Sequence, residues 1–228
     1  MTAPVKYFFD FVSQPSRALY IIFKISGSNV ENIPVALRRD EHLMEKFRSE
    51  VNRFQKVPCI VDGDYKLSES IAILRYMQRR GEIKDSLYPQ DSHKELSKVD
   101  EFLEWQHLTL RRSCESCFRM KWLDPILGIQ READVIEESQ KMMDLNLDII
   151  ENIWLKDNSF LTGKSLTAAD IFGACEVEQT KLFGYNAAKN RPLMEAWLGK
   201  VRSETNPYFK EAHVFVDKAS RRHKVFVN

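Results

Sequence analysis

The sequence predicts two domains of different class, a small α/β domain followed by an all-helical bundle. Three observations support this prediction. A strand–helix–strand pattern opens the chain, a hairpin pattern and another helix follow it, and nearly every later segment has helical periodicity. We expect the α/β domain over residues 1–82, a polar linker over residues 83–92, and the helical domain over residues 93–228.

The first unit of the α/β domain can be followed residue by residue. Residues 5–12 are aromatic and β-branched, which is typical of a buried strand. Ser13 is a good helix N-cap, and Pro15 is favoured in a first helical turn. We expect the helix that follows to end at Gly27, because glycine commonly adopts the left-handed conformation there.

The remaining elements complete a four-stranded layer. In the α/β domain they are an edge strand over residues 33–37 with Pro34, a helix over 41–51, hairpin strands over 57–61 and 65–67, and a helix over 70–80. A strand–helix–strand unit implies a right-handed crossover, and the hairpin adds antiparallel neighbours. This is the pattern of a thioredoxin-like sheet. In the second domain we expect helices over residues 93–121, 132–155, 167–182, 191–203 and 207–220.

Composition narrows the class of protein. The 228 residues include 34 Lys and Arg against 33 Asp and Glu, so no overall field attracts nucleic acid or an anionic membrane. The basic run over residues 221–224 is interpreted as a solvated tail. The sequence lacks the apolar region of a signal peptide near Met1 and a run long enough to span a membrane. We therefore expect a cytoplasmic protein.

The cysteines point to packing rather than chemistry. Four cysteines in this length do not form a disulfide scaffold. Cys114 and Cys117 lie at i and i+3 of a predicted helix and lack a second pair for zinc. We expect both to pack on one helix face, and Cys59 and Cys175 to be buried thiols.

The segment from Lys56 to Ser70 is the most informative about function. Pro58 cannot donate to a strand ladder, so we expect it at the first residue of a strand. The backbone N–H and C=O of Val57 would then be free to pair with a peptide-like ligand. The helix beginning near Glu69 offers N–H groups and a positive dipole end to a carboxylate. Together these features predict a pocket for a small charged peptide.

Residue patterns alone leave plainer alternatives for most of these positions. Ser13 could donate to a bound anion, but spacing alone favours an ordinary N-cap serine. His42 and Lys56 alone would be surface residues, and Glu69 with Ser70 is a common helix start.

Three blocks of the sequence resemble the theta class of glutathione S-transferases. They are DFVSQPSRALY at residues 10–20, KVP at 56–58 with LSESIAIL at 67–74, and FLTG at 160–163 with LTAADI at 166–171. The first block is specific for theta-like members, and the resemblance covers nearly the whole chain. It implies a cytosolic glutathione S-transferase fold with a glutathione-binding first domain, an electrophile-binding second domain, and a homodimer.

The resemblance also implies roles for single residues. Ser13 would be the catalytic serine that hydrogen-bonds the glutathione sulfur. The implied glutathione-binding residues are Val57, through its backbone, with a cis Pro58; Glu69 and Ser70 at the γ-glutamyl group; and His42 and Lys56 near the glycyl carboxylate. Arg111 matches an arginine that faces the electrophile pocket in some theta enzymes. An arginine paired with acidic residues of a helix or of the dimer interface is an equally good interpretation of Arg111.

The expected activity is transfer of glutathione, without a metal, to small hydrophobic electrophiles such as alkyl halides and epoxides, with reduction of organic hydroperoxides as a further possibility. The alternative is a non-catalytic module that binds glutathione or apolar ligands, or serves as a scaffold. A thioredoxin-like disulfide reductase is disfavoured because Ser13 stands where a cysteine is needed. Since the sequence ends at Asn228, the resemblance implies an open site like that of shorter, insect-like members.

One further motif is structural. Thr167 and Asp170 fit the spacing of a capping box, and Leu166 with Ile171 fits the accompanying hydrophobic contact. We expect this motif to begin a helix of the second domain and to take no part in chemistry.

Overall fold

The computed structural model describes residues 3–226, with side chains up to Arg221, so most of the basic run at 221–224 lies outside the described side chains. The predicted four-stranded sheet is confirmed, with strand order β2-β1-β3-β4. The strands are β1 (Val5–Phe9), β2 (Val30–Pro34), β3 (Cys59–Asp62) and β4 (Tyr65–Ser68). β1 runs parallel to β2 and antiparallel to β3, as the strand–helix–strand and hairpin patterns predict.

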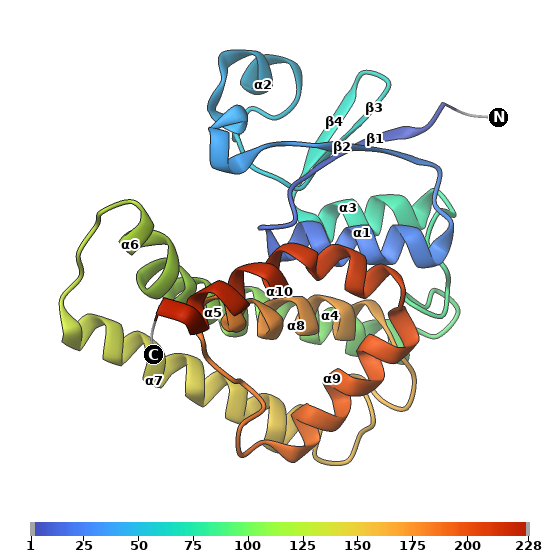
Figure 1. Cartoon of the computed structure of the whole chain (residues 1–228). Helices are drawn as coiled ribbons and strands as arrows, with labels where there is room; N and C mark the ends of the chain where they lie inside the picture. Colours follow the sequence, from blue (N-terminus) through green and yellow to red (C-terminus); the bar gives the residue numbers. More distant parts are fainter. Residues whose placement is uncertain (1–2, 227–228) are drawn as a thin grey trace.

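Helices cover both faces of the sheet (Figure 1). α1 (Gln14–Ser26) and α3 (Ser70–Arg79) lie between the sheet and the helical domain, and α2 (Glu45–Glu50) lies on the opposite side. Both faces need cover because successive side chains of a strand point to opposite faces of the sheet. Tyr7 faces the main core, and Phe8 packs into a smaller cluster with Phe47 of α2. The layers of the α/β domain could therefore be predicted from the spacing of apolar residues and from the connections between the strands.

Two predicted elements between β1 and β3 differ from the observed ones. The edge strand is Val30–Pro34 instead of 33–37, because the parallel register pairs Val5 with Val30 and ends at Pro34. The helix over 41–51 is replaced by 3₁₀ turns at Leu37–Arg39 and Glu41–Leu43, followed by α2. Left-handed Asp40 and extended Met44 interrupt helical geometry at both ends of the second turn. The apolar residues of this segment have helical spacing, but the segment does not form one continuous helix.

The second domain is all-helical over residues 93–226. Its helices are α4 (His93–Leu108), α5 (Leu110–Phe118), α6 (Asp124–Ile126), α7 (Ala133–Ile149), α8 (Ala168–Gln179), α9 (Pro192–Thr205) and α10 (Tyr208–Phe226). Shorter turns are π-helical at Arg119–Leu123 and Ile150–Trp154 and 3₁₀ at Thr180–Phe183. The predicted helix over 93–121 is broken at Thr109, whose backbone leaves the helical region. None of the helices within residues 3–226 has both the length and the apolar character needed to span a bilayer.

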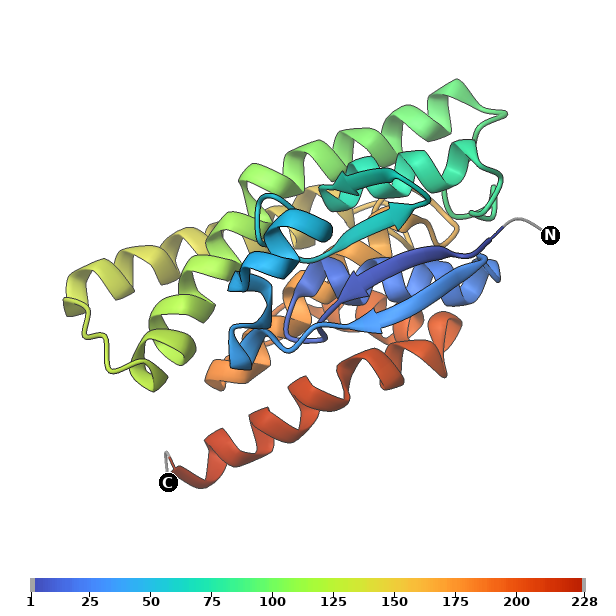
Figure 2. The same ribbon diagram turned by 90° about the horizontal axis from the view of Figure 1, so that it is seen from above.

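The centre of the molecule is α8, which is buried along its whole length. It packs on α1 of the first domain and on α4, α5 and α9 of the second. Its start is the predicted capping box, in which the Thr167 N–H donates to Asp170 Oδ2 at 2.9 Å. Asp170 also accepts from Trp197 Nε1 at 2.9 Å, so one buried carboxylate joins α8 to α9. Figure 2, seen from above, shows α10 beside α1 and the sheet lying over the helical domain.

Candidate active site

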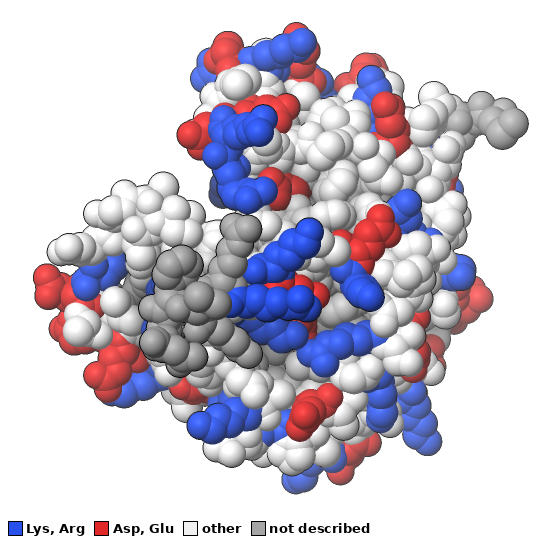
Figure 3. Space-filling view, viewed as in Figure 1, with Lys and Arg blue, Asp and Glu red and all other residues white. Residues whose placement is uncertain are grey.

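A cleft of about 1710 Å³ lies between the two domains. One wall comes from the loop after β1, the 3₁₀ turns and the loop before β3. The other wall comes from α5, the α6 segment and α10. In Figure 3 the surface is hollowed between the lobe around α2 at the top and the lobe around α6 at the left. All eight residues named as site candidates line this cleft; they are Ser13, His42, Lys56, Val57, Pro58, Glu69, Ser70 and Arg111.

Ser13 stands at the N-cap of α1, as predicted, with its hydroxyl at the positive end of the helix. Its Oγ accepts a hydrogen bond from the Ser16 N–H at 3.4 Å and donates to the Val57 carbonyl at 3.5 Å. Both contacts are long. The N-cap role uses the oxygen as an acceptor, so the single hydroxyl proton can be redirected to a ligand without loss of the cap.

The loop that carries Ser13 is anchored by Asp10. The Asp10 carboxylate accepts from the Val12 N–H at 2.7 Å and from the Leu37 N–H at 3.1 Å. The Ser13 N–H donates to the Asp10 carbonyl at 3.0 Å. This turn explains why β1 ends at Phe9 and not at residue 12 as predicted from its apolar run. Sequence reasoning did not assign Asp10 a role, although an acid directly after a strand is a known turn signal.

Val57 and Pro58 form the opposite side of this pocket. The Val57–Pro58 peptide bond is cis, which confirms the geometry implied by the resemblance. β3 begins at Cys59, so Pro58 directly precedes the strand and is not its first residue as predicted. The prediction that the Val57 carbonyl is free is wrong, because it accepts from the Ser13 hydroxyl. Within the described part of the chain, the Val57 N–H has no hydrogen-bond acceptor, so it remains available for a ligand backbone.

Glu69 and Ser70 begin α3 at the edge of the cleft. Glu69 is the N-cap and has φ 71° and ψ 114°, a conformation that a non-glycine residue rarely adopts. Strained backbone of this kind gathers at functional sites, where it fixes the direction of a side chain. No side chain caps the first turn in the described structure, so its N–H groups and dipole can receive an anion.

His42 and Lys56 line the same cleft. Lys56 is exposed, and its carbonyl accepts from Asn52 Nδ2 at 2.7 Å. His42 lies in the second 3₁₀ turn, and its Nδ1 is buried with no hydrogen-bond partner among the described residues. Asn52 and Gln55 also shape this loop, since Gln55 takes φ 53° and donates to the Leu43 carbonyl at 2.7 Å. Neither residue was identified from the sequence.

The wall from the helical domain combines rings and cations. Phe118 stacks on Trp122 with ring centres 5.2 Å apart, and Trp122 meets Phe215 of α10 edge to face at 6.2 Å. The guanidinium of Arg38, from the first domain, lies 4.6 Å from the Phe215 ring centre. The two domains therefore touch across the mouth of the cleft through a cation–π contact. This group was not identified from the sequence because Phe215 and Arg38 lie far along the chain from Phe118 and Trp122.

Arg111 lies in α5 on the same wall and is partly exposed to the cleft. Its Nη1 is 3.7 Å from Glu176 Oε1 on α8. Both interpretations of this arginine are therefore compatible, since it faces the cleft and pairs with an acid. Burial raises the pKa of Glu176 to about 7, and Arg111 opposes this shift.

The four cysteines are buried and unpaired, as expected. Burial raises the pKa of Cys59 and of Cys175 to about 12, so neither thiol forms a thiolate near neutral pH. Among the described side chains, which extend to Arg221, His, Cys, Asp and Glu are not grouped in the threes or more that could hold a metal ion.

The fold and cleft define a class of protein, in which a thioredoxin-like domain with a cis-proline loop faces a helical domain across a shared binding site. Comparisons with known proteins agree. The model "Glutathione S-transferase, N-terminal domain" matches residues 3–79, and "Glutathione S-transferase, C-terminal domain" matches residues 102–204. The chain is 36% identical to glutathione S-transferase theta-1 of Bos taurus over 94% of this chain and 90% of that protein. Identity to theta-1 of Homo sapiens is 35% with the same coverage.

Solved structures agree with the relatives. Human glutathione-S-transferase T1-1 in its apo form superposes with a TM-score of 0.89 at 34% identity, covering 95% of this chain and 91% of that one. Human glutathione transferase theta-2, in complex with glutathione and an unknown ligand, gives a TM-score of 0.90 at 31% identity, covering 96% and 90%. The chain belongs to the glutathione S-transferase family, in its theta class.

Proposed function

We propose that this protein is a glutathione transferase that conjugates the glutathione thiol to small hydrophobic electrophiles. Membership in the theta class supports the reaction, and the theta-2 complex supports glutathione as the co-substrate. The observation that carries the proposal is one cleft that brings together the Ser13 hydroxyl, the unpaired Val57 N–H and the uncapped start of α3.

The bound tripeptide lies along the loop before β3. Its cysteinyl residue pairs with the Val57 backbone beside the cis Pro58. Its γ-glutamyl carboxylate accepts from N–H groups at the start of α3 and from Ser70, and its amine meets the Glu69 carboxylate. Its glycyl carboxylate lies near His42 and Lys56. The spread of these groups along one wall of the cleft supports this orientation.

Ser13 stabilises the thiolate; it does not remove the proton. A serine hydroxyl is far too weak a base, so the thiol proton goes to solvent, and the hydroxyl donates a hydrogen bond to the sulfur anion. The thiolate then attacks an electrophilic carbon, the new C–S bond forms, and the leaving group departs with its electron pair. With an epoxide, the opened oxygen takes a proton from water.

The electrophile lies against the rings of Phe118, Trp122 and Phe215, with Arg111 on the same wall of the cleft. Apolar and aromatic lining favours alkyl halides and epoxides, and proximity to the thiolate accounts for much of the rate. Organic hydroperoxides are a further class for the same site. The thiolate attacks the terminal peroxide oxygen, the O–O bond breaks and the alcohol leaves. A second glutathione then converts the sulfenic acid to the disulfide with loss of water.

The test combines binding and turnover. Titration calorimetry of the purified protein with glutathione should give a saturable signal, and 4-nitrobenzyl chloride with glutathione should yield the thioether. A non-catalytic module would bind glutathione and form no product above the rate in buffer. Absence of binding by well-folded protein would reject the proposal altogether.

The quaternary structure belongs to the same proposal. Family membership supports a homodimer, and Tyr65 of β4 and Leu108 of α4 are apolar candidates for its interface, at 47% and 71% exposure. Sedimentation of the wild type and of Leu108→Asp should give a dimer and a weakened dimer; a monomeric wild type would reject this part.

A further inference from the structure

Arg17 is the most unusual buried side chain in the structure. It lies in α1 and is fully buried. Its guanidinium makes five hydrogen bonds, and all five acceptors are neutral groups. They are the Phe11 carbonyl at 2.7 Å, the Val12 carbonyl at 3.4 Å, the Cys175 carbonyl at 2.9 Å, Gln179 Oε1 at 2.7 Å and His213 Nε2 at 3.2 Å.

One end of this network holds the loop that precedes Ser13. The carbonyls of Phe11 and Val12 are the two directly before it, and a single guanidinium nitrogen of Arg17 binds both. Gln179 Nε2 donates to the Val12 carbonyl as well, at 3.2 Å. The direction of the peptide that enters Ser13 is therefore set by two side chains.

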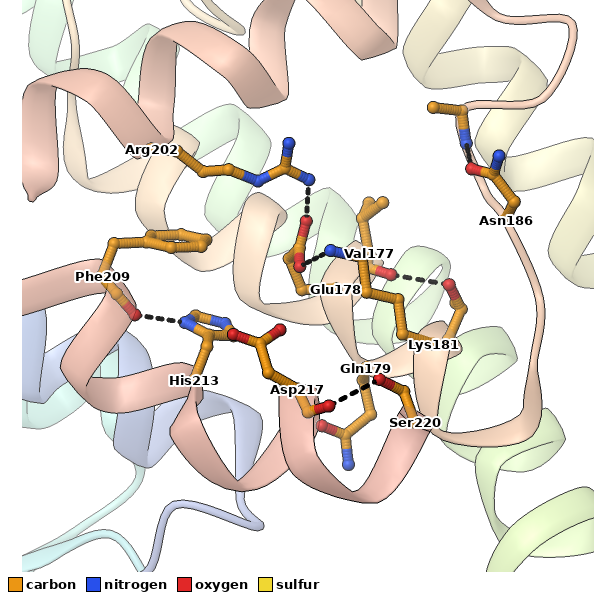
Figure 4. A network of polar contacts seen from close by, with 12 residues as sticks. Val177, Glu178, Gln179, Lys181, Asn186, Arg202, Phe209, His213, Asp217 and Ser220 are labelled. Atoms are coloured by element: carbon orange, nitrogen blue, oxygen red, sulfur yellow. Dashed lines mark hydrogen bonds and ion pairs between the residues drawn. The ribbon is translucent and has the colours of Figure 1, made fainter. Parts of the chain in front are cut away.

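The other end of the network is in the helical domain. Gln179 and Cys175 belong to α8, and His213 belongs to α10. The His213 Nδ1 lies 2.8 Å from the Phe209 carbonyl (Figure 4). Since a carbonyl can only accept, Nδ1 carries the proton, and Nε2 accepts from Arg17. Burial, reinforced by Arg17, holds the pKa of His213 well below its usual value, so the ring stays neutral. The network therefore keeps one hydrogen-bonding pattern across the physiological pH range.

Neutral acceptors make the network costly, which argues that it has a purpose beyond packing. Burial lowers the pKa of Arg17, and the hydrogen bond to Cys175 and the acidic side chains of Glu176 and Glu178 in α8 oppose this shift. A guanidinium nevertheless stays protonated in proteins. Hydrogen bonds to neutral groups offset only part of the desolvation penalty of a buried charge, and an apolar residue of the same volume would avoid that penalty.

We infer that Arg17 is a positioning residue, which orients the Ser13 hydroxyl toward the glutathione sulfur by fixing the Phe11 and Val12 carbonyls. Groups of the helical domain hold its guanidinium in place, namely the Cys175 carbonyl, Gln179 and His213. This inference rests on the proposed function of Ser13. Arg17 does not line the cleft, and it acts only through the loop. The helical domain thereby contributes to thiol activation as well as to electrophile binding.

The test measures the pKa of the bound thiol, from the ultraviolet absorbance of the thiolate in the glutathione complex as the pH is varied. We expect Arg17→Met to raise this pKa by about one unit, which lowers the rate below that pKa about tenfold. The Kd for glutathione should stay near the wild-type value, because the groups at Val57 and α3 are unchanged. A merely structural role would lower the folded fraction and leave the pKa of the remaining complex unchanged.

A double-variant cycle separates position from charge. In a Ser13→Ala background, Arg17→Met should add no further shift of the thiol pKa, because its effect passes through the missing hydroxyl. If Arg17→Met raised the thiol pKa equally with and without the Ser13 hydroxyl, the charge of the guanidinium would act on the thiolate directly. That result would overturn the inference. Arg191→Met is the matched control, since Arg191 is also buried and bonds Asp148 Oδ1 at 2.8 Å within the helical domain. It should leave the thiol pKa unchanged.

Two further measurements keep the outcome decisive. If Arg17→Met does not fold, Gln179→Leu removes one contact to the Val12 carbonyl and should raise the thiol pKa by a smaller amount, again only when Ser13 is present. An unchanged pKa in Gln179→Leu would then reject the inference. If Ser13→Ala itself leaves the pKa unchanged, the proposed function of Ser13 fails; if Ser13→Ala raises it and Arg17→Met does not, only the role of Arg17 fails.

Discussion

Replacement of Ser13 by alanine tests the centre of the mechanism. A hydrogen bond to a charged group contributes about 1.5–3 kcal/mol, and one pKa unit corresponds to about 1.4 kcal/mol. The Ser13 hydroxyl can therefore lower a thiol pKa near 8.5 by about one to two units. At pH 7 the thiolate fraction then rises from about 3% to between about 25% and 75%. We expect Ser13→Ala to lower kcat/KM at pH 7 by roughly 8- to 25-fold.

The pH dependence gives the direction of the effect. The wild-type rate should reach its plateau at a lower pH than the rate of the variant, and the two should converge above the higher pKa. The cost to folding should be small, at the low end of about 0.5–2 kcal/mol for an N-cap, because the contacts of Ser13 at 3.4 and 3.5 Å are long. Loss of stability therefore does not account for the loss of rate.

Ser16→Ala is the matched control. It removes the same atom three residues further along α1, where the hydroxyl is buried without a hydrogen-bond partner among the described residues. Its removal should leave the pH profile unchanged and should be neutral or slightly stabilising. The measurements are kcat/KM for 4-nitrobenzyl chloride across pH and the absorbance of the bound thiolate. Identical profiles for the wild type and Ser13→Ala would refute the reasoning.

Three further results are expected. Thr167→Ala should cost about 1 kcal/mol of unfolding free energy, up to about 2, as measured by denaturant titration, and should lower the yield of folded protein; a weaker affinity for glutathione at unchanged stability would contradict the capping role. Glu69→Gln should weaken glutathione binding about tenfold or more in calorimetry, since the ligand amine loses a charged partner; an unchanged Kd would exclude that contact. Burial raises the pKa of Glu176 from 4.5 to about 7, so the folded state holds its proton more tightly than the unfolded chain does, and stability falls as the pH rises from 4.5 to 7. Glu176→Gln should therefore stabilise the protein at pH 8 and much less at pH 5 in thermal unfolding; an equal effect at both values would be the contrary result.

Much of the fold could be predicted because its signals are local. The period of apolar residues identifies β1 and α1, and Gly27 with φ 69° ends α1 where the sequence indicated. The capping box at Thr167 is complete within four residues. The segment from Leu37 to Glu50 was mispredicted because left-handed Asp40 interrupts an amphipathic pattern that has the right period. The spacing of apolar residues contains no information on the backbone conformation of a single residue such as Asp40.

The candidate site divides in the same way. Ser13 and Glu69 are found from the sequence because each begins a helix, and helix starts have a recognisable composition. The contact between Arg38 and Phe215, and the pair Arg111 and Glu176, join residues from distant parts of the chain. Such contacts depend on how the domains pack, and a single sequence contains no signal for them.

The sequence by itself determined the order of elements, the helix starts and the strand–proline loop, because hydrogen-bonding and burial requirements act over a few neighbouring residues. Only the tertiary structure decided that the Val57 carbonyl meets the Ser13 hydroxyl, and that α8 and α10 reach Arg17 beneath it. The physical reason is that desolvation of a charge or a carbonyl depends on everything packed around it. The surroundings of a buried group are therefore a property of the assembled layers, whatever the length of chain between them.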